Sequence, residues 1–209
     1  MRALFKGINN QLQYMAYAFR RLYGIIITKR RFNINGVKHK SYKCYGIPYI
    51  EIEDGCEIVL GDNFAMNNGL AGNCIGYNSP CIFRAEGGNI NIGDNVGMSQ
   101  TVLVAKSGGD ITIGNNVLIG GGVKIYTSDF HSLDYMDRRN RQIDVKNRKT
   151  SAVSIGDDCF IGAGTIILKG VTIGPRVVIG AGSVVTKSIP ADSIAAGNPC
   201  SVINQRQIL

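Results

Sequence analysis

The sequence predicts an all-β domain built as a parallel β-helix, preceded by a short helical segment and interrupted by one protruding loop. Two observations lead to this fold class: aliphatic residues return every six positions, and a second set of small residues follows in phase. A period of six matches neither the 3.6-residue period of a helix nor the alternation of a strand. It matches a short strand followed by a corner, and three such units close one triangular coil of about eighteen residues.

The period is clearest in the last third of the chain. Every sixth position there is aliphatic, at Ile155, Ile161, Ile167, Ile173, Ile179 and Val185. Small or β-branched residues follow four positions later, at Cys159, Thr165, Val171, Val177 and Ser183. The same phase appears earlier at Ile92, Met98 and Val104, and at Ile113, Ile119 and Ile125. We expect the aliphatic residues to point inward as one buried column, with the smaller residues beside the bends.

The corners of the coil also leave a signature. The phrase Ile-Gly followed by two Asp or Asn residues recurs at 92–95, 113–116 and 155–158. Glycine, Asn and Asp adopt the backbone conformations of tight turns more readily than β-branched residues do. These phrases are therefore expected to form corners between successive strands.

The chain divides into three parts by pattern and charge. We expect a basic, partly helical N-terminal segment over 1–50, the β-helix over 51–203 with a loop at 127–152, and a tail over 204–209. The first fifty residues hold ten Lys or Arg and no Asp or Glu, whereas the other 159 hold thirteen basic and fifteen acidic residues. Nucleic-acid binding is not expected, because no aromatic–basic motif or known binding module appears.

Residues 8–23 predict an amphipathic helix, because apolar side chains recur there at spacings of three and four. These residues are Ile8, Leu12, Met15, Phe19 and Leu22. The helix could cap the open end of the β-helix or pack in a trimer, since solenoid ends need covering. A peripheral contact with acidic membrane lipids is the alternative.

The cellular compartment is predicted from what the sequence lacks. No apolar run approaches the roughly 18 residues of a membrane-spanning helix, and the first residues are too polar for a signal peptide. The six cysteines form no C-x-x-C pair and are interpreted as buried, reduced thiols. We therefore expect a cytoplasmic protein, with the inner face of the membrane as a second location.

The run from Ile155 to Ile203 resembles the hexapeptide-repeat acyltransferases, in particular sugar O-acetyltransferases of the galactoside and maltose type. It reads IGDDCFIGAGTIILKGVTIGPRVVIGAGSVVTKSIPADSIAAGNPCSVI. The resemblance implies a left-handed β-helix, an exception to the usual right-handed crossover. It also implies acetyl-coenzyme A as cosubstrate, no metal, and a homotrimer with sites between subunits.

The hexads stop after Ile125 and resume near Val153, and the polar segment between them should project as a loop. His131 lies in this loop, in the phrase Asp129-Phe130-His131-Ser132, where the family shows D-H-H-S. The resemblance implies that His131 is the general base, since histidine titrates near neutral pH. Asp129 is expected to orient the imidazole or bind the acceptor, or else to bond its own backbone.

The resemblance places the coenzyme along the C-terminal coils, at Phe160, Ala163, Ala181, Thr186, Lys187, Ser201 and Arg206. Phe160 stands where the family has a Trp, and the two small alanines would let the pantetheine arm pass. Thr186 and Lys187 match a T-K pair at the nucleotide end. Ser201 replaces a basic residue of the family, and Arg206 is the candidate to compensate for that loss.

The predicted function is transfer of an acetyl group to a hydroxyl of a sugar or polysaccharide precursor, directly within a ternary complex. An N-acetyltransferase acting on an amino-sugar nucleotide is one alternative. A non-catalytic scaffold is another, because Phe130 and Ser201 depart from the family pattern. A zinc hydratase of the same fold would need three histidine ligands, and this chain has two histidines.

Overall fold

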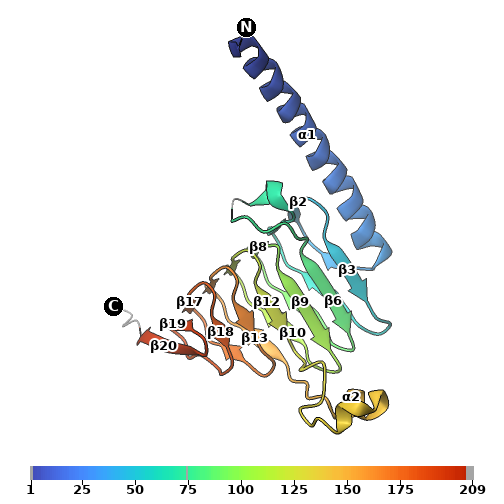
Figure 1. Ribbon diagram of the computed structural model, residues 1–209, viewed down its shortest axis with the longest axis vertical. Coiled ribbons are helices and arrows are strands. Elements are labelled where there is room, and N and C mark those ends of the chain that lie inside the picture. Colours follow the sequence, from blue (N-terminus) through green and yellow to red (C-terminus); the bar gives the residue numbers. More distant parts are fainter. Residues whose placement is uncertain (1, 74, 206–209) are drawn as a thin grey trace.

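The computed structural model describes residues 2–73 and 75–205. Three sheets of parallel strands form the faces of a triangular prism, with a long helix at one end and a projecting loop near the other (Figure 1). Sheet A contains β1 (Lys38–His39), β4 (Ile58–Leu60), β7 (Ile90–Ile92), β10 (Ile111–Ile113), β13 (Val153–Ile155) and β16 (Thr172–Ile173).

The other two faces repeat the same order, one strand per coil. Sheet B contains β2 (Tyr42–Tyr45), β5 (Phe64–Asn67), β8 (Gly97–Ser99), β11 (Leu118–Ile119), β14 (Phe160–Ile161), β17 (Val178–Ile179), β19 (Ser193–Gly197) and the antiparallel β20 (Cys200–Gln205). Sheet C contains β3 (Tyr49–Ile52), β6 (Ile82–Glu86), β9 (Val102–Lys106), β12 (Lys124–Tyr126), β15 (Ile166–Ile167) and β18 (Val184–Val185). The chain visits A, B and C in turn, and the predicted left-handed parallel β-helix is confirmed.

The core is the predicted aliphatic column. The repeating residues from Ile155 to Val185 are all buried, and so are the smaller residues Cys159, Thr165 and Ser183. Strand register explains this, because Ile113 pairs with Ile155 and Ile155 with Ile173 on successive coils. Each coil thus stacks like side chains on like and buries them together.

The turn from sheet A to sheet B, the A/B corner, carries the recurrent Asp and Asn residues. Their side chains bond from coil to coil: Asn63 Nδ2 donates to Asn95 Oδ1 over 3.0 Å, and Asn95 Nδ2 to Asn116 Oδ1 over 3.1 Å. Asn116 Nδ2 continues the ladder to Asp158 Oδ1 over 3.1 Å. These residues have positive φ angles, which Asn and Asp adopt more readily than most residues.

Helix α1 (Arg2–Ile34) is longer than the predicted 8–23. It ends where Gly36 takes a left-handed conformation (φ 66°) and Val37 N donates to Phe32 O over 2.9 Å, as in a Schellman cap. Thr28 and Phe32 are buried against the first coil, so the last turns cover that end of the prism. The preceding turns project away from it (Figure 1).

The strands of the β-helix begin at Lys38, before the boundary at residue 51 that we expected. Residues 68–80, with the short helix η1 (Leu70–Gly72), interrupt the second coil between β5 and β6. Residues 127–152 lie between β12 and β13 and contain η2 (Asp137–Arg139) and α2 (Arg141–Asn147). No helix among the described residues is long and apolar enough to span a membrane.

Candidate active site

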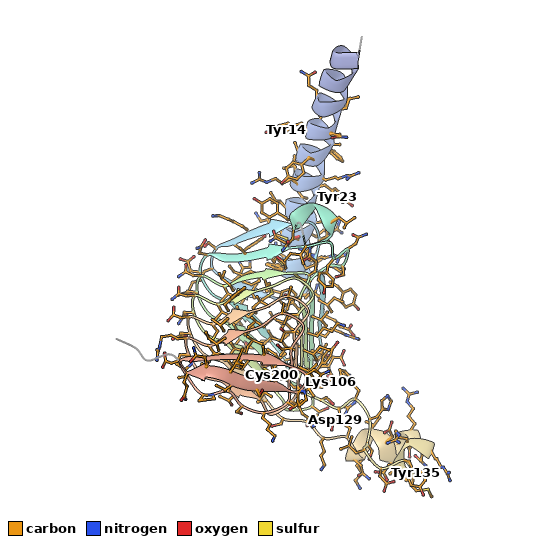
Figure 2. All side chains as sticks on the ribbon, turned by 60° about the vertical axis from the view of Figure 1, so that its left-hand side comes forward. Tyr14, Tyr23, Lys106, Asp129, Tyr135 and Cys200 are labelled. Carbon is orange, nitrogen blue, oxygen red and sulfur yellow. The ribbon has the colours of Figure 1, made fainter. Side chains whose placement is uncertain are left out.

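His131 lies in the projecting segment 127–152, at the turn from sheet C to sheet A. Figure 2 shows this segment standing off the prism beyond Asp129, with Tyr135 near its tip. The His131 imidazole is 69% exposed, and its Nδ1 lies 2.7 Å from Asp144 Oδ2. Asp144 comes from α2, which is capped at its N-terminus by Asn140, whose side chain accepts hydrogen bonds from Gln142 N and Ile143 N. The sequence thus builds a helix that presents a carboxylate to the histidine.

This pair fixes which imidazole nitrogen can act on a substrate. A carboxylate accepts hydrogen bonds, so Nδ1 of His131 is assigned as the donor toward Asp144. In the neutral imidazole, Nε2 then carries the free lone pair and can take a proton. The side chain of Asp144 is only 9% exposed, which holds the carboxylate in place while the imidazole faces solvent.

Polar contacts make the segment a defined structure. Asp144 Oδ1 accepts the backbone N–H of Ser132 over 2.7 Å, and Ser132 Oγ bonds Asp137 Oδ2 over 2.6 Å. Arg138 donates to the carbonyl oxygen of Ser132 over 2.7 Å. The hydrogen bond from His131, followed by that from Ser132 N–H, lowers the pKa of Asp144 below its usual value. The Ser132 hydroxyl similarly lowers the pKa of Asp137.

Asp129, for which orienting the imidazole was one of the expected roles, makes a different contact in the structure. Its Oδ1 pairs with Lys169 Nζ at 2.7 Å, at the same corner of the prism. Asp144 makes the contact with His131 instead. No motif in the sequence pointed to Asp144, because it lies thirteen positions after His131 and α2 must form before the two meet.

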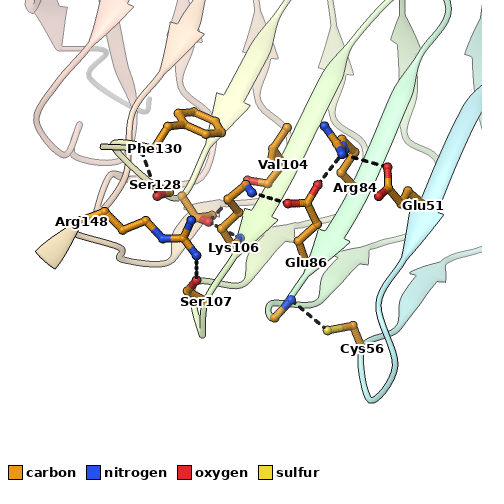
Figure 3. A network of polar contacts seen from close by, with 12 residues as sticks. Glu51, Cys56, Arg84, Glu86, Val104, Lys106, Ser107, Ser128, Phe130 and Arg148 are labelled. Carbon is orange, nitrogen blue, oxygen red and sulfur yellow. Dashed lines mark hydrogen bonds and ion pairs between the residues drawn. The ribbon is translucent and has the colours of Figure 1, made fainter. Parts of the chain in front are cut away.

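Phe130 takes the place of the family's other histidine and has a packing role. It adopts a left-handed backbone (φ 65°), with its ring 5.3 Å from Tyr126 and 5.8 Å from Lys106 Nζ, measured from the ring centroid. Lys106 continues into a row of charges along sheet C: it pairs with Glu86, and Arg84 bridges Glu86 (2.7 Å) and Glu51 (2.9 Å) (Figure 3). A polar surface therefore leads from sheet C to the residue before His131.

The predicted coenzyme residues lie on more than one corner. Ala163 and Ala181 follow strands of sheet B and form the turn toward sheet C, the B/C corner. Thr186 and Lys187 follow β18 and share the C/A corner with the His131 segment. The coils stack closely at the B/C corner, since a Cβ on Gly162 would lie 2.4 Å from Ala181 N. One chain therefore places its His131 on a different corner from its two alanines.

The remaining predicted positions are on sheet B or beyond it. Phe160 points outward from β14 and is about half exposed. Ser201 is exposed on β20, opposite Ala196. Arg206 lies outside the described residues.

Tyr77 is a further residue of the B/C corner that our sequence reasoning missed. It belongs to the insertion at 68–80 and lies over the glycines of the next coils. A Cβ on Gly122 would be 2.7 Å from its ring, and one on Gly164 would be 3.1 Å from its hydroxyl oxygen. The signal in the sequence was the 14-residue break between β5 and β6, residues 68–81, which must project as the later loop does.

Comparisons with known proteins agree with the fold and the repeat. The Saccharomyces cerevisiae protein YJL218W, a proposed acetyltransferase, is 44% identical over 126 residues, which is 60% of this chain and 61% of that protein. The chain thus spans about three fifths of that relative. The acetyltransferase VCA0836 of Vibrio cholerae O1 biovar eltor, solved with acetyl-coenzyme A, superposes with a TM-score of 0.53 at 29% identity, covering 86% of this chain and 78% of that one.

Another solved structure superposes more closely, but its sequence identity is low and the likeness supports only the fold. The N-acyltransferase AntD of Bacillus cereus, solved with dTDP and 3-hydroxybutyryl-CoA, gives a TM-score of 0.66 at 22% identity, covering 86% of this chain and 88% of that one. Residues 152–187 match the family model described as bacterial transferase hexapeptide (six repeats). The resemblance seen in the sequence is confirmed: residues 152–187 carry the repeats of the bacterial hexapeptide transferases.

Proposed function

We propose that this protein transfers an acetyl group from acetyl-coenzyme A to a hydroxyl of a sugar or polysaccharide precursor. The observation that carries the proposal is the His131–Asp144 pair, which lies on a loop of a hexapeptide β-helix. A solvent-facing imidazole with a fixed tautomer is suited to general-base catalysis. VCA0836, which shares the fold and is solved with acetyl-coenzyme A, supports the choice of acyl donor.

The reaction then needs a single proton carrier. His131 Nε2 takes the hydroxyl proton as the acceptor oxygen attacks the thioester carbonyl, and a tetrahedral intermediate forms. The C–S bond breaks, the acetyl group stays on the acceptor oxygen, and the coenzyme sulfur receives the proton from the imidazolium. Asp144 stabilises the imidazolium while it exists, so it acts as a positioning residue. No acyl-enzyme is required.

We further propose that each site lies between two subunits of a homotrimer. The His131 segment leaves the C/A corner, whereas Ala163 and Ala181 lie at the B/C corner, with sheet C between them. A neighbouring subunit would bring its B/C corner to the first subunit's C/A corner and complete the site. The coenzyme would then be bordered by Phe160, Thr186, Lys187 and Ser201.

The activity test measures release of coenzyme A with sugars, amino sugars and sugar nucleotides, for the wild type and His131→Ala. We expect acetylation of a hydroxyl, and a loss in kcat of about a hundredfold or more in the variant. Equal activity in the two proteins would exclude His131 as the base. Acetylation of an amino group in place of a hydroxyl would identify an N-acetyltransferase. The absence of both turnover and coenzyme binding would favour a non-catalytic scaffold.

A mixing experiment tests the shared site. His131→Ala and Ala163→Trp chains are each expected to be inactive, one lacking the base and the other blocking the corner. Random mixed trimers would pair an intact histidine with an intact corner in about a quarter of the sites. Activity near that fraction supports a site between subunits. No recovery in trimers shown to be mixed would place the whole site in one chain.

A further inference from the structure

Helix α1 carries an apolar stripe that the β-helix does not cover. Large side chains of this stripe recur at spacings of three and four and are each more than half exposed: Leu12, Met15, Phe19, Leu22 and Ile26. Thr28, which is buried on the first coil, lies nine residues after Phe19 and hence about 180° around the helix. The stripe therefore faces away from the prism, and something other than the β-helix must cover it.

The charged side chains around the stripe are all basic. The first fifty residues contain ten basic and no acidic residues, and Arg20, Lys29 and Arg30 pair with no carboxylate in the described part of the chain. A cleft of about 380 Å³ beneath the helix is lined by Arg21, Lys29 and other residues, and its lining includes no acid. A second cleft, of about 320 Å³, is lined by Arg20 and Arg21 and again includes no acid.

This distribution disfavours a second copy as the occupant. Parallel helices that pack through such a stripe are usually matched by opposite charges at the positions beside it. Here those positions are uncharged: Ala16, Ala18, Tyr23 and Ile25. Copies side by side would also bring Arg20 and Lys29 of each chain together with no compensating acid.

We propose that α1 is an amphipathic anchor that binds the surface of a bilayer containing anionic phospholipids. Its apolar stripe would enter the interface between head groups and acyl chains, and the basic residues would meet lipid phosphates. Tyr23 is exposed beside the stripe (Figure 2) and suits the head-group level, where aromatic rings with a polar end collect. The inference is independent of the proposed transferase activity.

The experiment is co-flotation of the full chain with vesicles, without coenzyme or acceptor. One set contains phosphatidylcholine alone and the other about 30% phosphatidylglycerol, each at about 0.1 M and about 1 M salt. We expect binding to the anionic vesicles at low salt that weakens at high salt. The variant Arg20→Gln/Lys29→Gln/Arg30→Gln should lose the preference for anionic lipid.

Two matched double variants test the apolar stripe. Phe19→Gln/Leu22→Gln should weaken partitioning at least about tenfold. The control Leu133→Gln/Ile203→Gln removes equally exposed apolar residues elsewhere and should bind as the wild type does; Phe19 is 71% and Leu133 72% exposed. Unchanged helical circular dichroism would show that the fold is retained.

The proposal would be overturned if the wild type bound neither kind of vesicle, if both double variants lost binding equally, or if binding did not depend on lipid charge. A stripe variant that changes the sedimentation coefficient but not vesicle binding would show that α1 packs on another copy, and would also overturn it.

Discussion

Replacing Asp144 by Asn tests whether the contact to His131 sets the chemistry of the site. The side chain keeps its shape and can still accept the Ser132 N–H, a 2.7 Å bond in the native protein, through its amide oxygen. Its NH₂ group would then face His131 Nδ1. Nδ1 must accept that bond, so the proton moves to Nε2 and the lone pair that serves as base is lost.

The expected loss follows from the exposure of the pair. A hydrogen bond to a charged group contributes about 1.5–3 kcal/mol, and the lower end applies because the His131 side chain is 69% exposed. About 1.5 kcal/mol corresponds to about tenfold in kcat. The wrong tautomer adds to this loss, since a general base as a whole contributes about 10²–10⁴-fold. We therefore expect kcat to fall by about ten- to a hundredfold.

Steady-state kinetics with an identified acceptor measures this effect. The KM for acetyl-coenzyme A should be unchanged in Asp144→Asn, because the substitution alters the base and not the coenzyme corner. The matched control is Asp134→Asn, which changes a carboxylate of the same loop that bonds Met136 N over 2.8 Å. A loss below about threefold in Asp144→Asn, or an equal loss in the control, would refute the orientation argument.

Three other predictions concern the B/C corner, the stacking of successive coils, and the segment 127–152. Removing the Tyr77 ring by Tyr77→Ala should raise the KM for acetyl-coenzyme A about fivefold with little change in kcat, in the same kinetic assay. Gly156→Val should lower the free energy of unfolding by about 1–3 kcal/mol in denaturant titrations, because its Cβ would lie 2.6 Å from a backbone nitrogen of the next coil; Gly97→Ala, which meets only a flexible side chain, should not. The pKa values of Asp137 and Asp144 are lowered on folding, so their stabilisation is present at neutral pH and is lost as pH falls through the folded pKa, below about pH 4. Proteolysis within 127–152 should accelerate there, and an Asn double variant should flatten that pH dependence; an unchanged profile would contradict it.

The sequence predicted the core well because six-residue spacing is a local property. A residue such as Ile161 is buried because the residues at 155 and 167 repeat its environment on the adjacent faces. The length of α1 was not predicted, since the β-branched run at 25–27 has lower helix propensity than the residues before it. Gly36 was nevertheless a readable stop, because a glycine after a basic last turn is typical of a helix C-cap.

The six-residue spacing could not predict contacts between segments that are distant in the sequence. Asp144 reaches His131 only because α2 folds back, and Tyr77 reaches the corner glycines only because the 68–80 insertion folds over later coils. Neither approach follows from spacing, since each depends on the path of a loop. The contact with the imidazole is of the same kind: Asp144 makes it, whereas Asp129, which is nearer to His131 in sequence, pairs with Lys169.

One part of the site's geometry was nevertheless encoded in the repeat itself. Each hexad is one face of the prism, so counting hexads modulo three assigns every turn to a corner. Ala163 and Ala181 follow the hexads of Ile161 and Ile179, which both belong to sheet B. The His131 segment follows the hexad of Ile125, which belongs to sheet C. The separation of the proposed base from the proposed coenzyme corner therefore follows from phase alone, and this separation is the reason for proposing that a second subunit completes the site.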